Sequence, residues 1–125
     1  KAMLDQFKDA GVDVFPGSEV FLLDGLRAGG KGCITATGNV NPGPISEVYK
    51  NWNTGRADEL QAGITATRKI MQKVPMIPAL KAVTAFFGND PAWKTVRPPL
   101  TELTPDQEKQ VITELKASGF SMPGL

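Results

Sequence analysis

The sequence has no histidine, one cysteine and one tyrosine among its 125 residues. Without histidine, it lacks the side chain that most often serves as a general base or metal ligand near neutral pH. Its single cysteine, Cys33, cannot form a disulfide within the chain or build a cysteine-based zinc site. An enzyme that contains this chain must therefore use lysine, tyrosine, carboxylate or backbone groups, or residues outside it.

Strong charge and long apolar runs are also missing. The formal net charge is +1, which gives no reason to expect a nucleic-acid or membrane surface. The longest uncharged apolar runs, such as residues 20–23, fall far short of the ~20 residues that span a bilayer. The first eleven residues are amphipathic, unlike a signal peptide. We therefore expect a cytoplasmic protein.

The first third of the sequence has the pattern of a βαβ unit. Residues 12–15 alternate briefly between apolar and polar, which predicts a short strand. The stretch that follows is predicted to be a helix. It begins with Ser18, a good N-cap, and ends at residues 29–30, both glycine. Residues 31–37, "KGCITAT", are small, apolar and β-branched, which is typical of a strand buried on both faces. Units of this kind build parallel sheets or barrels.

The remainder of the chain has helical patterns. Apolar spacing predicts helices over residues 45–52, 60–74, 77–87 and 105–118, with one more over residues 2–10. Thr104 and Gln107 form the signature of a capping box at the start of the last helix. Two parallel strands with several helices make a poor independent domain, because the sheet edges would be left unpaired. The chain therefore has the pattern of the C-terminal part of something larger; a small self-sufficient helical domain with a two-stranded ribbon is the alternative.

Four motifs in order carry a family resemblance. They are "VFPGSE" at residues 14–19, "AGGKGCITATGNVNP" at 28–42, "PMIPALKA" at 75–82 and "VRPPLTELTPDQ" at 96–107. Together they resemble the closing segment of the dihydrodipicolinate synthase / N-acetylneuraminate lyase superfamily of class I, Schiff-base aldolases and lyases. The similarity extends along essentially the whole chain. Gly38 departs from the family pattern, which usually has alanine there.

The resemblance implies an α/β fold, the C-terminal part of a (β/α)8 TIM barrel. Residues 1–44 would hold strands 7 and 8, and residues 45–125 the last barrel helix and a C-terminal helical bundle. It also implies a pyruvate- or 2-oxo-acid-dependent lyase that works through a lysine imine with an aldehyde partner, without cofactor or metal, as a homotetramer. The reactive lysine and the relay tyrosine would lie in the missing N-terminal barrel portion, so no catalytic residue is expected in this chain.

Four substrate-binding residues follow from the same resemblance. The main chain of Gly17 and Ile34 would lie against the imine-bound keto acid, with the Ile34 side chain filling the core. The hydroxyl of Ser18 and the carboxylate of Glu19 would bond to hydroxyls of the aldehyde or sugar acid. The alternatives are that Gly17 only forms a turn, that Ser18 and Glu19 only cap a helix, and that Ile34 is only core.

Other readings stay open. Thr35, Thr37 and Asn39 alternate along the second predicted strand, and we expect them to satisfy buried backbone groups at its end. The alternative is that some of them point into the barrel mouth. A 2-keto-3-deoxy-sugar-acid aldolase, a 4-hydroxy-2-oxoglutarate aldolase and a keto-deoxy sugar acid dehydratase share the imine chemistry. A non-catalytic helical interaction module is the hypothesis from a different class of protein.

Overall fold

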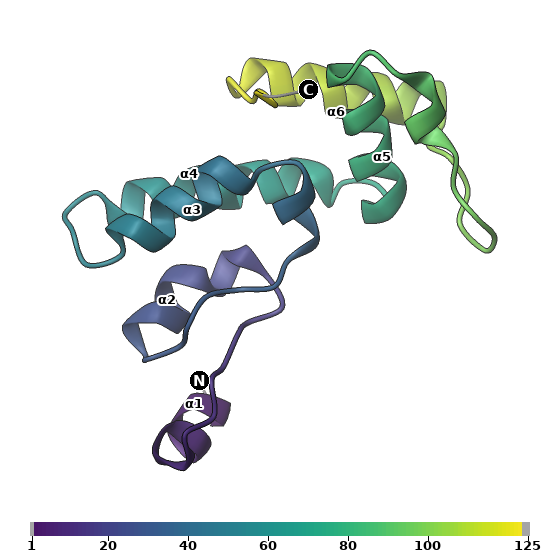
Figure 1. Ribbon diagram of the computed structural model, residues 1–125. Coiled ribbons are helices and arrows are strands. Elements are labelled where there is room, and N and C mark those ends of the chain that lie inside the picture. Colours follow the sequence, from purple (N-terminus) through teal and green to yellow (C-terminus); the bar gives the residue numbers. More distant parts are fainter. Residues whose placement is uncertain (1, 124–125) are drawn as a thin grey trace. The chain divides into compact units, whose positions relative to one another are not determined.

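The computed structural model describes residues 2–123, apart from the side chain of residue 8. The chain divides into two compact units, Lys1–Thr65 (unit 1) and Ala66–Leu125 (unit 2). The boundary falls within helix α4 (Ala57–Met71). Figure 1 shows the elements coloured along the sequence, with unit 1 in purple to teal and unit 2 in teal to yellow. Each unit is described by itself below.

Unit 1 consists of short helices joined by extended chain. Residues 12–16 form a first extended segment, before α2, and residues 31–35 form a second one, after it. The helical elements are α1 (Ala2–Phe7), η1 (Lys8–Ala10), η2 (Glu19–Phe21), α2 (Leu22–Arg27), η3 (Ala36–Asn39), α3 (Pro42–Asn51) and the first part of α4.

The core of unit 1 is an apolar cluster that α2, α3 and α4 share. It forms because α2 buries one leucine-rich face, and each of the other two helices turns part of its apolar stripe to the same place. The buried members are Leu22, Leu23, Leu26, Val48, Ala57 and Ile64. Each side chain in the cluster is at most 7% exposed, so this small core holds three helices together.

The predicted α/β fold class, with strands 7 and 8 of a (β/α)8 barrel, is wrong for the part of the chain that the structure describes. Residues 2–123 contain helices, turns and extended chain but no strand. The two extended segments do touch: Lys31 N–H donates to Val14 O and Ile34 N–H donates to Pro16 O, both at 3.0 Å. The donors are three residues apart but the acceptors only two, so the contacts do not repeat as a regular ladder.

The two segments are brought together by a tight glycine turn after α2. Gly29 has φ 94°, a left-handed value that favours glycine. The Gly30 amide donates to Gly25 O at 2.7 Å, and a Cβ on Gly30 would lie 2.8 Å from that oxygen. The expected closure of this helix by glycines is thus confirmed, and only glycine fits the second position.

Unit 2 consists of α5 (Met76–Phe87), η4 (Pro91–Lys94) and α6 (Pro105–Ala117), after the end of α4. Helix α5 packs on both η4 and α6. Val83 and Leu115 are fully buried, and the rings of Phe87 and Phe120 meet edge to face at 5.3 Å between centroids. The core of unit 2 therefore lies between helices of ordinary length.

The helix predictions agree with the structure across both units. Residues 45–52, 60–74 and 77–87 were expected to be helical, and α3, α4 and α5 cover most of those ranges. The capping box is present in full: Gln107 N–H donates to Thr104 Oγ1 at 3.3 Å, and Thr104 N–H donates to Gln107 Oε1 at 3.0 Å. These helices form where the sequence carries both an apolar stripe and a stop signal.

Candidate functional site

Residues 16–19 and 34–37 lie side by side in unit 1, and we call this pair of segments the junction. The amide of Ile34 donates to Pro16 O at 3.0 Å, so the main chain of Ile34 adjoins that of Gly17. The junction therefore brings together all four residues expected to bind substrate: Gly17, Ser18, Glu19 and Ile34. Substrate binding by these four residues stays a prediction.

The centre of the junction is the carboxylate of Glu19, whose side chain is only 1% exposed. Thr35 Oγ1 donates to Glu19 Oε2 at 2.5 Å, and Thr37 Oγ1 donates to Glu19 Oε1. The two hydroxyl oxygens lie 3.4 Å from each other. A buried carboxylate that accepts charge-assisted hydrogen bonds is a strong tie between the segments that carry the groups.

Ser18 caps the helical turn that starts at Glu19. Its backbone is extended, with φ −151° and ψ 138°, and its Oγ accepts from Val20 N–H at 3.3 Å. The expected capping role of Ser18 is thus confirmed. It leaves a substrate contact open, because a hydroxyl has a donor and a second lone pair besides the one that caps the helix.

Gly17 is exposed, and its local structure gives no steric reason for a glycine. A Cβ built on Gly17 meets no atom within 4 Å, and its φ is not in the left-handed region. The turn itself therefore does not require glycine at this position. Close approach of a ligand, the other reason proposed for Gly17, stays a prediction.

The Ile34 side chain does not fill a core, contrary to expectation. It is 74% exposed. Val12, Phe15 and Phe21 are also largely exposed, at 51%, 45% and 59%. Unit 1 therefore exposes several large apolar side chains on and next to its two extended segments.

The two threonines and Asn39 behave differently from each other. Thr37 is fully buried and Thr35 partly so, and both bond to the Glu19 carboxylate. The exposed Asn39 instead donates from Nδ2 to Ala36 O at 2.9 Å, within its own helical turn. The expected bond to a backbone group is thus found for Asn39, whereas the carboxylate partner of the two threonines was not foreseen.

Gln61 on α4 is a contributor that the sequence did not reveal. Its Nε2 donates to Glu19 O at 3.0 Å and to Val20 O at 3.3 Å, while its Oε1 accepts from Leu23 N–H at 3.1 Å. One side-chain amide thus satisfies backbone groups some forty residues away. The only available signal was its place beside Leu60 in the apolar stripe, which names no partner.

Cys33 lies in the second extended segment, next to the junction. Its thiol is partly buried, and that burial, together with the nearby Glu19 carboxylate, raises the pKa of Cys33. A raised thiol pKa keeps the side chain protonated and poorly nucleophilic. This environment therefore favours an inert thiol at Cys33.

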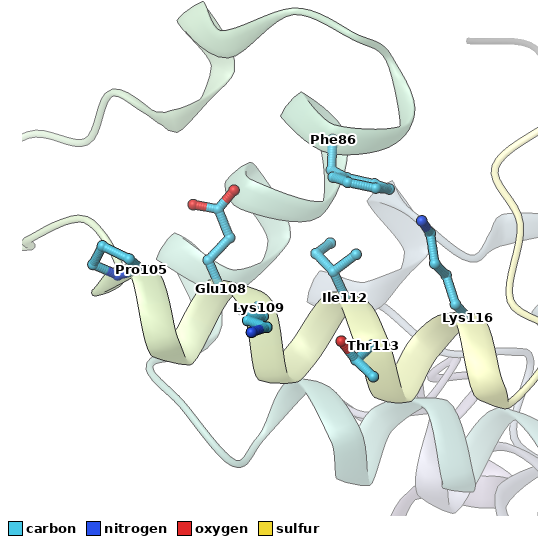
Figure 2. A pocket seen from close by; sticks show the side chains of 7 residues that line it. All are labelled: Phe86, Pro105, Glu108, Lys109, Ile112, Thr113 and Lys116. Carbon is cyan, nitrogen blue, oxygen red and sulfur yellow. The ribbon is translucent and has the colours of Figure 1, made fainter.

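Unit 2 has a shallow depression of about 350 Å³ (Figure 2). Its apolar floor is formed by Phe86 and Ile112, and Lys116 Nζ lies 4.5 Å from the Phe86 ring centroid. Glu108 at its edge pairs with Lys94 at 2.6 Å. None of the residues expected to bind substrate lines it, so the junction is the candidate site.

Two classes of site find no support in residues 2–123. No group of three or more cysteine or carboxylate side chains there is placed to hold a metal ion. No helix in the same range is long and apolar enough to cross a membrane.

Comparison with known proteins shows the family to which the chain belongs. Residues 3–118 match the Dihydrodipicolinate synthetase family. The chain belongs to this family. It is 33% identical over 112 residues to the 4-hydroxy-tetrahydrodipicolinate synthase of Methanopyrus kandleri, covering 86% of this chain and 36% of that one. It is 30% identical over 121 residues to a protein of Coccidioides immitis named as a candidate mitochondrial 4-hydroxy-2-oxoglutarate aldolase, covering 86% and 38%.

Solved structures agree on the fold. A Sulfolobus solfataricus 2-keto-3-deoxygluconate aldolase variant superposes with a TM-score of 0.79 at 20% identity, covering 94% of this chain and 41% of that one. Dihydrodipicolinate synthase of Cyanidioschyzon merolae gives a TM-score of 0.79 at 17% identity, with the same coverage. The chain thus spans about two fifths or less of the length of these relatives.

Proposed function

We propose that the chain is the C-terminal portion of a 2-oxo-acid-dependent class I aldolase or lyase that acts through a lysine imine. The family match over residues 3–118 supports the class of enzyme. The reactive lysine and the relay tyrosine belong, in this proposal, to polypeptide outside these 125 residues. The limited span of the relatives that the chain covers, 36–38% in the two curated relatives above, agrees with that division of labour. The predicted division of the chain after residue 44 stays part of the proposal.

The observation that carries the proposal is the contact of the two main-chain segments at the junction. Ile34 N–H bonds to Pro16 O, so the backbone groups of Gly17 and Ile34 lie together at one place. In the proposed reaction the lysine nitrogen adds to the carbonyl carbon of the 2-oxo acid and water leaves. The resulting imine withdraws electrons from the neighbouring carbon–carbon bond. Backbone groups at the junction would orient the bound oxo acid.

Ser18 is the side chain at the junction best suited to a second substrate. It is partly exposed, and its hydroxyl proton is available to an aldehyde or sugar-acid oxygen while the oxygen caps the helix. The proposed substrates are therefore a 2-oxo acid such as pyruvate with an aldehyde partner. Assembly as a homotetramer and a cytoplasmic location are predictions that accompany this proposal.

The exposed apolar side chains of Val12, Phe15 and Ile34 support the idea that unit 1 is part of a larger folded body. Three such side chains on neighbouring segments are costly to leave in water, at about 25 cal/mol for each square ångström of apolar surface. We propose that other polypeptide of the intact enzyme covers them. The isolated chain would expose this apolar surface and would be prone to aggregation.

The test is borohydride trapping in the intact protein that carries these residues. Incubation with pyruvate and borohydride reduces an imine to a stable amine, which intact mass spectrometry detects as an adduct. We expect the adduct on the intact protein and none on residues 1–125 alone. An intact protein that folds and gains no adduct would contradict the proposal and favour a non-catalytic interaction module.

A substrate panel then distinguishes aldolase from dehydratase chemistry. An aldolase releases pyruvate from 4-hydroxy-2-oxoglutarate or a 2-keto-3-deoxy sugar acid, whereas a dehydratase releases water and keeps the carbon chain intact. Coupled pyruvate detection and product mass spectrometry separate the two. We expect carbon–carbon cleavage or formation, and loss of water alone would assign the dehydratase.

A further inference from the structure

We propose that Glu19 is a positioning residue, which fixes the main chain of Gly17 relative to that of Ile34 without touching substrate. This inference rests on the proposed function, because it is the oxo acid that the two main-chain segments would hold. It replaces the simpler idea that the Glu19 carboxylate binds a substrate hydroxyl directly.

Burial is the first argument. The Glu19 side chain is 1% exposed, whereas Gly17 is exposed and Ser18 partly exposed in the same turn. A carboxylate that binds the hydroxyl groups of a substrate must be accessible to that substrate. That of Glu19 instead faces the threonines of the second segment.

The second argument is the placement of its partners. Thr35 directly follows Ile34, and Thr37, which is fully buried, lies two residues further on. Their hydroxyls donate to different oxygens of Glu19, Thr35 to Oε2 and Thr37 to Oε1. Because the two bonds end on separate oxygens, the carboxylate resists both sliding and rotation of one segment against the other.

The third argument is that Glu19 is itself held from behind. Gln61 Nε2 donates to the Glu19 carbonyl oxygen at 3.0 Å, and Gln61 Oε1 accepts from Leu23 N–H at 3.1 Å. Ser18 caps the same turn. The main chain that carries the carboxylate is thus fixed independently, so the carboxylate can transmit a position from one segment to the other.

The consequence is a specific kinetic effect. Small errors of about 1 Å in placing reacting groups can cost about 100-fold in rate. Loosening the junction should slow imine formation with the oxo acid itself, whatever aldehyde follows. A direct contact to an aldehyde hydroxyl would leave that first step unchanged and alter selectivity among aldehydes.

The experiment measures the rate of pyruvate adduct formation under borohydride, without aldehyde, in the intact protein. The variants are Thr37→Val, which keeps the shape and removes the hydroxyl, Thr37→Ser, which restores a hydroxyl, and Glu19→Gln. Glu59→Gln, an exposed glutamate on α4, is the matched control. Rates are normalised to the folded fraction from circular dichroism, and Thr35→Val replaces any variant that fails to fold.

We expect Thr37→Val and Glu19→Gln to slow trapping about 10- to 100-fold, Thr37→Ser to recover most of the rate, and Glu59→Gln to match the unaltered protein. Unchanged trapping in Thr37→Val and Glu19→Gln would overturn the positioning role. If, with trapping unchanged, Glu19→Gln then lost turnover only with hydroxylated aldehydes in a separate assay, Glu19 would be a direct ligand. If the unaltered protein forms no adduct, it is the proposed function that fails.

Discussion

The two units of this chain hold themselves together by different means. Unit 1 depends on side chains that reach far along the sequence, such as Glu19 to Thr37 and Gln61 to Leu23. Unit 2 depends on α5 and α6, whose ends and apolar faces are marked by nearby residues, as in the capping box of Thr104.

The difference shows which contacts can be recognised from neighbouring residues in the sequence and which cannot. A helix with a cap and an apolar stripe needs only its neighbours in sequence to be recognised. A buried carboxylate needs partners whose distance in sequence is not fixed by any periodicity. The candidate site lies in the unit of the second kind, in keeping with the tendency of binding residues to occupy loops.

The largest expected effect comes from truncating the core of either unit. Leu22→Ala in unit 1 and Leu115→Ala in unit 2 should each lower the free energy of unfolding by about 2–5 kcal/mol, because each leucine is almost fully buried. Hydrogen exchange of backbone amides, read by mass spectrometry, measures the loss within the unit that carries the change. If Leu22→Ala left unit 1 unaffected, its apolar core would not matter and the comparison would have to be redrawn.

The next effect separates the units. Thr37→Val should lower the stability of unit 1 by about 1.5–3 kcal/mol, because a buried carboxylate loses a donor that bonds to its charge. Chemical denaturation followed by circular dichroism measures it. Thr101→Val, at an exposed position in unit 2, is the control. Equal stability of the two variants would show that the Glu19 contact adds nothing.

A local signal carries less energy. Thr104→Ala should cost about 0.5–2 kcal/mol, because it removes the capping oxygen from the first turn of α6. The expected sign is faster amide exchange in residues 105–109, with little change in unit 1. Thr101→Ala serves as its control. A loss that spread evenly over both units would blur the distinction between local and distant contacts.

The smallest effect is electrostatic, and one ion pair in each unit tests it. The Arg27 guanidinium donates to Asp58 at 2.9 and 3.0 Å and holds the pKa of that carboxyl below its usual 3.8. Lys73, with help from Gln110, holds the pKa of Glu114 below 4.5. Both pKa values are lower in the folded state than in the unfolded chain. The stabilisation is therefore full above the unfolded value and is lost as pH falls through the folded one.

Proton titration by NMR measures these two pKa values. Arg27→Gln and Lys73→Gln should return them toward 3.8 and 4.5 respectively. Added salt should shrink both shifts, because the pairs are exposed to solvent. Carboxyl pKa values that stay low in both variants would mean that other groups cause them.

Much of the fold could be predicted because the apolar spacing and the stop residues of the helices can be recognised in the sequence. Gly11, in a left-handed conformation at φ 71°, ends the first helical stretch, and Gly119, also left-handed, follows α6. The error concerned the segments at 12–16 and 31–35, whose composition is that of strands. A strand forms only where a neighbouring segment offers a regular series of backbone hydrogen bonds, and the composition of a segment does not determine this. Both segments are therefore extended without forming a sheet.

The sequence predicted which residues form the candidate site but not the hydrogen bonds among them. The sequence pointed to Gly17, Ser18, Glu19 and Ile34, and the structure brings them to one junction. The sequence did not predict that the Ile34 side chain is exposed, because burial depends on what packs against a segment and not on the hydrophobicity of the segment itself.

The sequence by itself determined the helices, their caps and the family to which the chain belongs, since each is written in short-range pattern or motif. Only the tertiary structure decided that Glu19 faces Thr35 and Thr37. The physical reason is that burying a carboxylate is favourable only where donors from elsewhere in the chain meet it, and the fold alone brings them there.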